Sequence, residues 1–199
     1  REYMTGFTGS AGTAIFTKDQ AGLWTDGRYF LQADKQLEGT TITLRKMGEP
    51  GVPTIPEYLA EALPSGGTLG VDGRVISVNT GDEYEKIAAD KGGKIQYHQD
   101  LIDQIWTDRP ELSREPVFAL GVEYAGETTE SKLTRIREEM KKNHADKHVL
   151  TTLDDICWTL NIRGNDVEFF PLVLSYAVIT MDSMELYIDE SKLDDELKA

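Results

Sequence analysis

Short runs with strand-like character alternate with longer runs of helical period, and this alternation restricts the fold of the chain more than any other feature. Residues 13–17 and 21–25 are typical of strands and flank a polar turn at 18–20. Residues 28–37 then place apolar side chains at helical spacing, and residues 42–44 alternate again as a strand. Alternating strands and helices with an opening hairpin predict an α/β fold with a mixed β-sheet, and they exclude a helix bundle or a β-sandwich.

Helix-start signals indicate two more helices in the first half of the chain. Thr54 and Glu57 have the spacing of a capping box, and residues 80–83 repeat that pattern before a second apolar stripe. Residues 69–72 have the apolar character of a buried strand, and residues 94–97 are predicted to return as a strand. The first half therefore continues the strand–helix alternation.

The second half begins with a predicted helix at 129–143, whose apolar residues form one stripe and whose charges occupy the other face. A strand at 148–152 and a short helix at 153–160 follow. Residues 172–180 and 184–188 are predicted to form a hairpin.

A segment with two prolines and several charges separates these halves. We expect a first domain at 1–104, a linker at 105–117 with Trp106 as an anchor, and a second domain at 118–199. The first half contains a hairpin and the elements after it, whereas the second contains a helix and a strand followed by a hairpin. The order of elements suggests two copies of one module, the first without its opening elements and the second without its last.

The charge of the chain excludes several classes of partner. The 21 basic and 35 acidic side chains give a net charge of −14, and no basic cluster is longer than Lys141–Lys142, so nucleic acid is not an expected partner. The most apolar stretch, residues 169–181, is too short to span a membrane. Because Cys157 is the only cysteine, no internal disulfide is possible, and we expect a reducing, cytoplasmic location.

Two segments are candidates for a functional site. The glycine-rich residues 6–12 lack the lysine and the hydroxyl residue of a phosphate-binding loop, and they are either a structural turn or a loop that faces a site. Arg28 follows a predicted strand, where α/β folds commonly place functional groups, and its planar guanidinium suits a carboxylate or a carbonyl. Asp26 is expected to cap the next helix, and Gly27 to permit the turn. The alternative role for Arg28 is a surface contact with Asp26.

The remaining polar residues suggest no catalytic centre. Asp154 and Asp155 are adjacent in the first turn of a predicted helix, where acids stabilise the helix dipole. Cys157 is expected to be a small buried side chain. The three histidines are expected to be exposed and form no metal-binding motif; they are His98, His144 and His148. The sequence thus predicts no catalytic residue and no metal ligand.

Several longer stretches resemble a known family. The segments that carry the resemblance are residues 3–14, 23–33 (LWTDGRYFLQA), 69–72, 101–110, 153–167 and 175–176. Together they are similar to the cytosolic type of X-prolyl aminopeptidase, aminopeptidase P, in register along essentially the whole chain. This resemblance implies two creatinase N-terminal-like domains, each a mixed β-sheet flanked by helices, which precede a catalytic domain in that family.

The resemblance also implies what the chain does not contain. The family removes an N-terminal residue that precedes proline, using two manganese or zinc ions held by two Asp, one His and two Glu in the third domain. We therefore expect an inactive piece of a metal-dependent hydrolase, which starts after the first helix and strand of domain one and stops within domain two. Its expected partners are a peptide with proline in second position, the parent's own catalytic domain and, through the parent, a second copy.

One role of the family extends to this chain. The arginine of the W-T-D-G-R-Y-F motif contacts the bound peptide, so the resemblance implies that Arg28 binds substrate. In one departure, Phe170 precedes Pro171 where the family usually has Asn. The alternative to an enzyme's N-terminal portion is a pseudo-enzyme module that binds peptides or proteins on the same fold.

Overall fold

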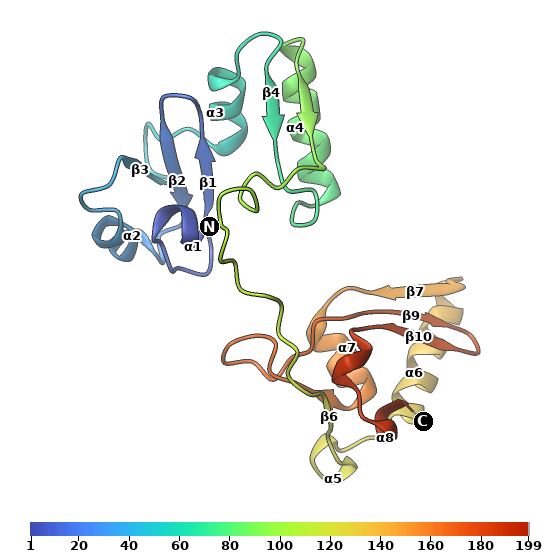
Figure 1. Ribbon diagram of the computed structural model, residues 1–199. Helices are drawn as coiled ribbons and strands as arrows, with labels where there is room; N and C mark the ends of the chain where they lie inside the picture. Colours follow the sequence, from blue (N-terminus) through green and yellow to red (C-terminus); the bar gives the residue numbers. More distant parts are fainter. Residues whose placement is uncertain (199) are drawn as a thin grey trace. The chain divides into compact units, whose positions relative to one another are not determined.

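The computed structural model describes residues 1–198, which divide into two compact units (Figure 1). The first unit is Arg1–Arg109, and the second begins at Pro110. Each unit combines small β-sheets with helices packed against them. The predicted α/β fold class is confirmed.

The first unit contains two sheets. Its elements are α1 (Glu2–Thr5), β1 (Thr13–Phe16), β2 (Ala21–Thr25), α2 (Phe30–Gln36), β3 (Ile42–Lys46), α3 (Ile55–Ala62), β4 (Thr68–Gly70), α4 (Val78–Asp90) and β5 (Lys94–Gln96). β1 and β2 form the predicted antiparallel hairpin, and β2 also pairs in parallel with β3. β4 and β5 form a separate parallel pair. The unit therefore contains two successive strand–helix–strand modules, β2–α2–β3 and β4–α4–β5.

β2 is the central strand of the first sheet, and both of its faces are covered. Because successive side chains of a strand point to opposite faces, Leu23 packs on one face against Phe7, while Trp24 packs on the other. The Trp24 ring lies 4.7 Å from the Tyr58 ring of α3, and its indole nitrogen donates a 2.8 Å hydrogen bond to the Pro53 carbonyl. This packing fixes the position of the loop that follows β2.

The capping box that opens α3 is confirmed. The Thr54 hydroxyl accepts a hydrogen bond from the backbone nitrogen of Glu57, whose carboxylate accepts one from the backbone nitrogen of Thr54. The prediction of a second capping box at 80–83 is wrong, because α4 starts at Val78 and Ser77 caps it. The predicted burial of residues 69–72 is also wrong: the strand ends at Gly70, and Leu69 is only half-buried.

The second unit is built around a three-stranded sheet of order β10–β9–β7. Its elements are β6 (Phe118–Ala119), α5 (Val122–Ala125), α6 (Thr129–Lys142), β7 (Lys147–Leu150), α7 (Leu153–Leu160), β8 (Ile162–Arg163), β9 (Tyr176–Thr180), β10 (Met184–Tyr187), the 3-10 turn η1 (Glu190–Lys192) and α8 (Asp195–Lys198). The described ladders of this unit are antiparallel. Met140 of α6 and Ile156 of α7 pack against Leu150 and Ile179, so α6 and α7 cover one face of the sheet (Figure 1).

The segment after β5 folds back onto the first unit. The Trp106 ring stacks on Tyr3 of α1, with centroids 4.4 Å apart and planes 8° apart. The Tyr3 hydroxyl also donates a 3.0 Å hydrogen bond to the Ile105 carbonyl. Trp106 thus serves as the anchor that the sequence suggested.

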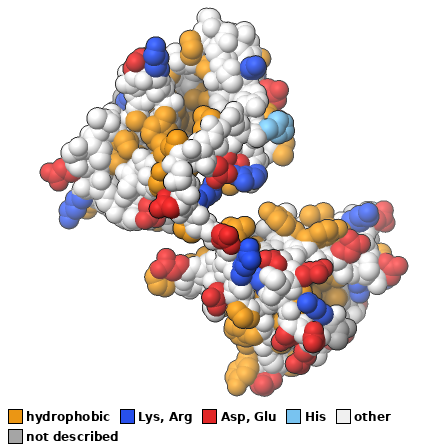
Figure 2. Space-filling view, viewed as in Figure 1, with side chains coloured by type: hydrophobic (Ala, Val, Ile, Leu, Met, Phe, Trp, Pro, Cys, Tyr) orange, Lys and Arg blue, Asp and Glu red, His pale blue; other side chains and the backbone are white. Residues whose placement is uncertain are grey.

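Acidic side chains dominate the charged surface. Figure 2 shows them spread over both units, with lysines and arginines in small separate groups on the visible face. Among residues 1–198, none of the helices has the length and apolar character needed to cross a bilayer.

Candidate functional site

Arg28 lies in a tight turn at the carboxyl end of β2. Its backbone nitrogen donates a 3.1 Å hydrogen bond to the Asp26 carboxylate, and the backbone nitrogen of Tyr29 donates to the Asp26 carbonyl at 3.0 Å. Because α2 begins only at Phe30, Asp26 closes this turn and does not cap the helix, contrary to the prediction. Gly27 is not at positive φ, and a Cβ there would meet Phe30 only at 3.9 Å, so the turn does not require glycine.

The Arg28 side chain forms a bidentate ion pair with Asp26. Its Nε and Nη2 atoms donate to the two carboxylate oxygens, each at 2.8 Å. Hydrogen bonding from Arg28 lowers the pKa of Asp26 to about 2, and the same contact raises the pKa of the guanidinium. The Arg28 side chain nevertheless remains 68% exposed. No residue of the described chain accepts a hydrogen bond from its Nη1 atom, so one edge of the guanidinium faces outward with its N–H groups available.

The ring of Tyr29 supports the guanidinium from one face. The Arg28 Cζ atom lies 5.2 Å from the ring centroid, a cation–π distance. The Tyr29 hydroxyl is 2.5 Å from the Ser10 hydroxyl, and this hydrogen bond lowers the pKa of Tyr29. Phe7 packs edge-on against the same ring at 5.9 Å. The glycine-rich loop therefore has two parts, with Phe7 in the core and Ser10 in contact with the Arg28 site.

A second Asp-Gly-Arg turn follows β4, and our sequence reasoning missed it. The backbone nitrogen, Nε and Nη2 of Arg74 donate to Asp72 at 3.0, 2.9 and 2.9 Å, as the corresponding atoms of Arg28 do to Asp26. The signal was present as the same three letters after each strand. Arg74 differs in having a further 2.9 Å bond to Asp100, which also binds Arg109.

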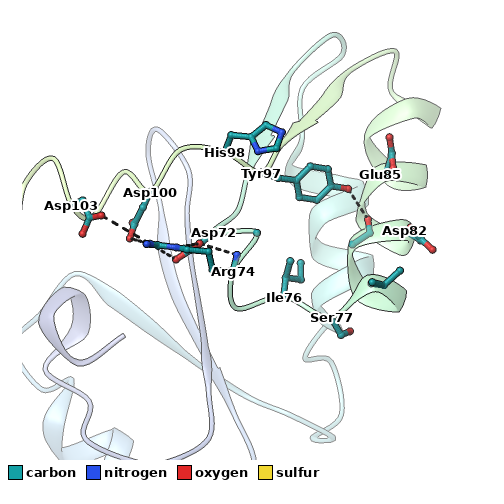
Figure 3. Close-up of a pocket in the computed structure, with 13 residues that line it drawn as sticks. Asp72, Arg74, Ile76, Ser77, Asp82, Glu85, Tyr97, His98, Asp100 and Asp103 are labelled. Carbon is teal, nitrogen blue, oxygen red and sulfur yellow. Dashed lines mark hydrogen bonds and ion pairs between the residues drawn. The ribbon is translucent and has the colours of Figure 1, made fainter. Parts of the chain in front are cut away.

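A cavity of about 730 Å³ opens beside this second turn. It lies past the ends of β4 and β5 and against the first turns of α4 (Figure 3). Its charged and aromatic lining residues are Asp72, Arg74, Asp82, Glu85, Tyr97, His98, Asp100 and Asp103.

Three of the acidic side chains of this cavity, Asp72, Asp100 and Asp103, pair with Arg74 or with the nearby Arg109. Figure 3 shows the guanidinium of Arg74 directed at Asp72 and Asp100. Burial would raise the pKa of Asp100, but the hydrogen bond from Arg109 and that from the backbone of Ile102 lower it overall. The cluster therefore fastens the segment after β5 to the end of β4.

The other polar residues singled out in the sequence remain apart. All three histidines are exposed, and Cys157 is buried, as predicted. Asp154 and Asp155 lie in the first turn of α7, where no side chain among the described residues makes a capping hydrogen bond. The described part of the chain contains no group of three or more His, Cys, Asp or Glu side chains placed to bind a metal ion.

Three buried charges in the second unit were also missed, because lysine and aspartate are expected at the surface. Lys132 of α6 donates to the Trp158 carbonyl at 2.7 Å and to the Asn161 amide oxygen at 2.5 Å, which satisfies the carboxyl end of α7. Burial lowers the pKa of this lysine. Asp166 forms a fully buried ion pair with Lys192.

Comparison with known proteins identifies both halves of the chain. The family model of the creatinase/prolidase N-terminal domain matches residues 1–105, and a second model with the same description matches residues 108–199. The chain belongs to the creatinase/prolidase N-terminal domain family. The two units of this creatinase/prolidase chain thus correspond to two matched domains.

Individual relatives give the same result. A probable Xaa-Pro aminopeptidase P of Neurospora crassa is 44% identical over 100% of this chain, which covers 29% of that protein. Aminopeptidase P2 of Arabidopsis thaliana is 41% identical over 100% of the chain and 28% of its own length. The solved X-prolyl aminopeptidase of Caenorhabditis elegans, described as a cytosolic enzyme with a di-nuclear active site, has a TM-score of 0.91 and 38% identity.

That structure is matched over 99% of this chain and 32% of its own length. The resemblance to X-prolyl aminopeptidases is therefore confirmed. The creatinase/prolidase chain spans about a third or less of the length of these relatives.

Proposed function

We propose that this chain is the non-catalytic N-terminal portion of an Xaa-Pro aminopeptidase, in which it shapes substrate access and supports assembly, and that Arg28 binds the peptide substrate. The observation that carries the proposal is the match of the whole chain, at a TM-score of 0.91, to part of an X-prolyl aminopeptidase. The substrate is a peptide with proline in second position, as the names of the relatives indicate.

The geometry of Arg28 supports a binding role. The guanidinium is exposed, its planar edge presents N–H donors, and Asp26 and Tyr29 hold it from two sides. A peptide carbonyl or carboxylate presents the complementary acceptor, and such charge-assisted hydrogen bonds are about twice as strong as neutral ones.

The hydrolytic chemistry belongs to another part of the parent protein. Residues 1–198 contain no cluster of side chains placed to hold a metal ion, whereas the relative from C. elegans is described as having a di-nuclear site. Two divalent ions, manganese or zinc, would supply an activated water and a Lewis acid in the catalytic domain. The 199-residue chain alone is then inactive, and its partners are that domain and, in a homodimer, a second copy of the parent. The cytosolic description of the same relative supports a cytoplasmic location.

Replacing Arg28 tests the binding role. In the full-length aminopeptidase, Arg28→Ala is expected to lower kcat/KM by about 10- to 150-fold, the loss that follows from removing a hydrogen bond to a charged group. Arg28→Lys is expected to restore only part of the activity, because an ammonium cannot reproduce the planar fork. The melting temperature is expected to stay nearly constant, since the side chain is exposed.

The kcat/KM value and the melting temperature are measured on the same preparation of Arg28→Ala. If Arg28 had only the structural contact with Asp26, Arg28→Ala would lower the melting temperature and leave kcat/KM of the folded enzyme intact. An unchanged kcat/KM would end the substrate-binding assignment.

A further inference from the structure

The first unit contains the same turn twice, and the two copies differ in what else their arginines bind. Arg28 and Arg74 both make the backbone, Nε and Nη2 contacts with the aspartate two residues earlier. Nη2 of Arg74 also binds Asp100. Within the described chain, Arg28 has no second acidic partner. The guanidinium of Arg74 is thus held by a second carboxylate as well, whereas that of Arg28 is held by Asp26 alone; among the described residues, neither Nη1 atom has a hydrogen-bond partner.

Asp26 determines which donors of Arg28 stay available. The carboxylate accepts hydrogen bonds from Nε–H and from one N–H of Nη2, and it also accepts one from the backbone nitrogen of Arg28, which fixes the turn itself. A free arginine side chain samples many rotamers, and ordering it on binding would weaken the interaction with a ligand. Held by Asp26 along one edge and by the Tyr29 ring on one face, the guanidinium is already ordered.

We propose that Asp26 is a positioning residue for peptide recognition: it orients Arg28 so that the Nη1 edge meets a backbone carbonyl of the peptide. This inference rests on the proposed function. A carbonyl suits the pair better than a carboxylate does, because the ionised Asp26 lies within the same pair and repels a second negative charge.

A double-mutant cycle in the full-length aminopeptidase tests the proposal. Asp26→Asn, Arg28→Ala and the double variant are assayed with a tripeptide that has proline in second position. Asp26→Asn keeps the size of the side chain and an oxygen for the turn, but its amide cannot accept both guanidinium bonds. We expect kcat/KM to fall about fivefold or more, mainly through KM, and the double variant to be no worse than Arg28→Ala alone.

The second turn supplies a matched control. Asp72→Asn removes the same contact from the same kind of turn. Because the proposal gives Arg74 no role in peptide binding, this variant is expected to leave kcat/KM unchanged. A loss in Asp72→Asn equal to that in Asp26→Asn would show that the effect is general to the fold and would overturn the proposal. Additive losses in the cycle would also overturn it, because Asp26 would then act independently of Arg28.

The cycle separates this inference from the proposed function. If Arg28→Ala lowers kcat/KM while Asp26→Asn does not, the positioning role is wrong and the binding role of Arg28 stands. If Arg28→Ala has no effect, the binding role is wrong, and the positioning role with it.

Discussion

At the scale of single residues, the second unit depends on charges buried in its interior. Lys132 satisfies two oxygens at the end of α7, and its ammonium lies 4.4 Å from the centroid of the Trp158 ring. Asp166 and Lys192 join the loop before β9 to the turn after β10. Removing one member of a buried ion pair costs more than the pair contributes, because an uncompensated charge remains.

Acid is expected to destabilise the chain through Asp166. Burial would raise the pKa of this carboxyl, but the ion pair with Lys192 and the hydrogen bond from the backbone of Leu174 lower it below 3.8. The unfolded chain therefore takes up a proton at a higher pH than the folded chain does. The stabilisation is present above pH 3.8 and is lost as pH falls through the folded pKa.

Melting temperatures of the wild type and Asp166→Asn, measured from pH 7 to pH 3, check this expectation. The variant is expected to be about 3–5 kcal/mol less stable at pH 7, since Lys192 loses its buried partner. Between pH 7 and pH 3, the melting temperature of the variant is expected to fall less than that of the wild type. If it does not fold, a variant in which Asp166 and Lys192 are both replaced by apolar residues provides the same comparison. If the melting temperatures of the wild type and Asp166→Asn fell in parallel with pH, the role given to Asp166 in acid destabilisation would be contradicted.

At the scale of elements, helix starts depend on which of several hydroxyl residues becomes the cap. Thr54 with Glu57 forms the expected box at α3. At α4 the box pattern at 80–83 lies inside the helix, because Ser77 accepts the hydrogen bond from the Thr80 backbone.

Ser77→Ala is therefore expected to destabilise the chain by about 1 kcal/mol, the usual cost of losing an N-cap. Thr80→Ala keeps the cap, and it is expected to have a smaller effect because alanine is a better helix former than threonine. Chemical denaturation of both variants makes the comparison. A greater loss of stability in Thr80→Ala than in Ser77→Ala would indicate that Thr80, and not Ser77, caps α4.

At the scale of the whole molecule, the chain passes from the first unit to the second through a segment without helix or strand. Residues 110–116 are mostly exposed, whereas Val117 is buried and donates a backbone hydrogen bond to Lys192. Proteases prefer exposed, extended segments, since they must accommodate the backbone in their active sites.

Trypsin is expected to cut first after Arg114 and to release the two fragments 1–114 and 115–199. Arg109 precedes a proline and is a poor site for trypsin. Intact-mass analysis at early times identifies the first cut, and Arg114→Gln serves as the control that removes it. An earlier cut outside residues 110–116 would show that the connecting segment is not the most accessible part of the chain.

Local patterns were sufficient for much of the fold. The hairpin at β1 and β2, the long helix α6 and the short helix α7 are all present where periodicity and turn residues indicated them, because their signals act over a few neighbouring residues. The position of Arg28 after a strand was also evident from the order of residues.

For other features the sequence offers several possible hydrogen-bond partners, and the folded chain selects one of them. Ser77 caps α4 instead of Thr80, Asp26 binds Arg28 instead of capping a helix, and Lys132 is buried by Trp158 and Asn161 from another helix end. A sequence pattern indicates which hydrogen bonds are possible. Only the folded chain brings particular donors and acceptors together, and it thereby decides which of these bonds are made. The tertiary structure likewise decided that Arg74 binds a second carboxylate, Asp100, while Arg28 binds Asp26 alone, although both occupy the same three-residue turn.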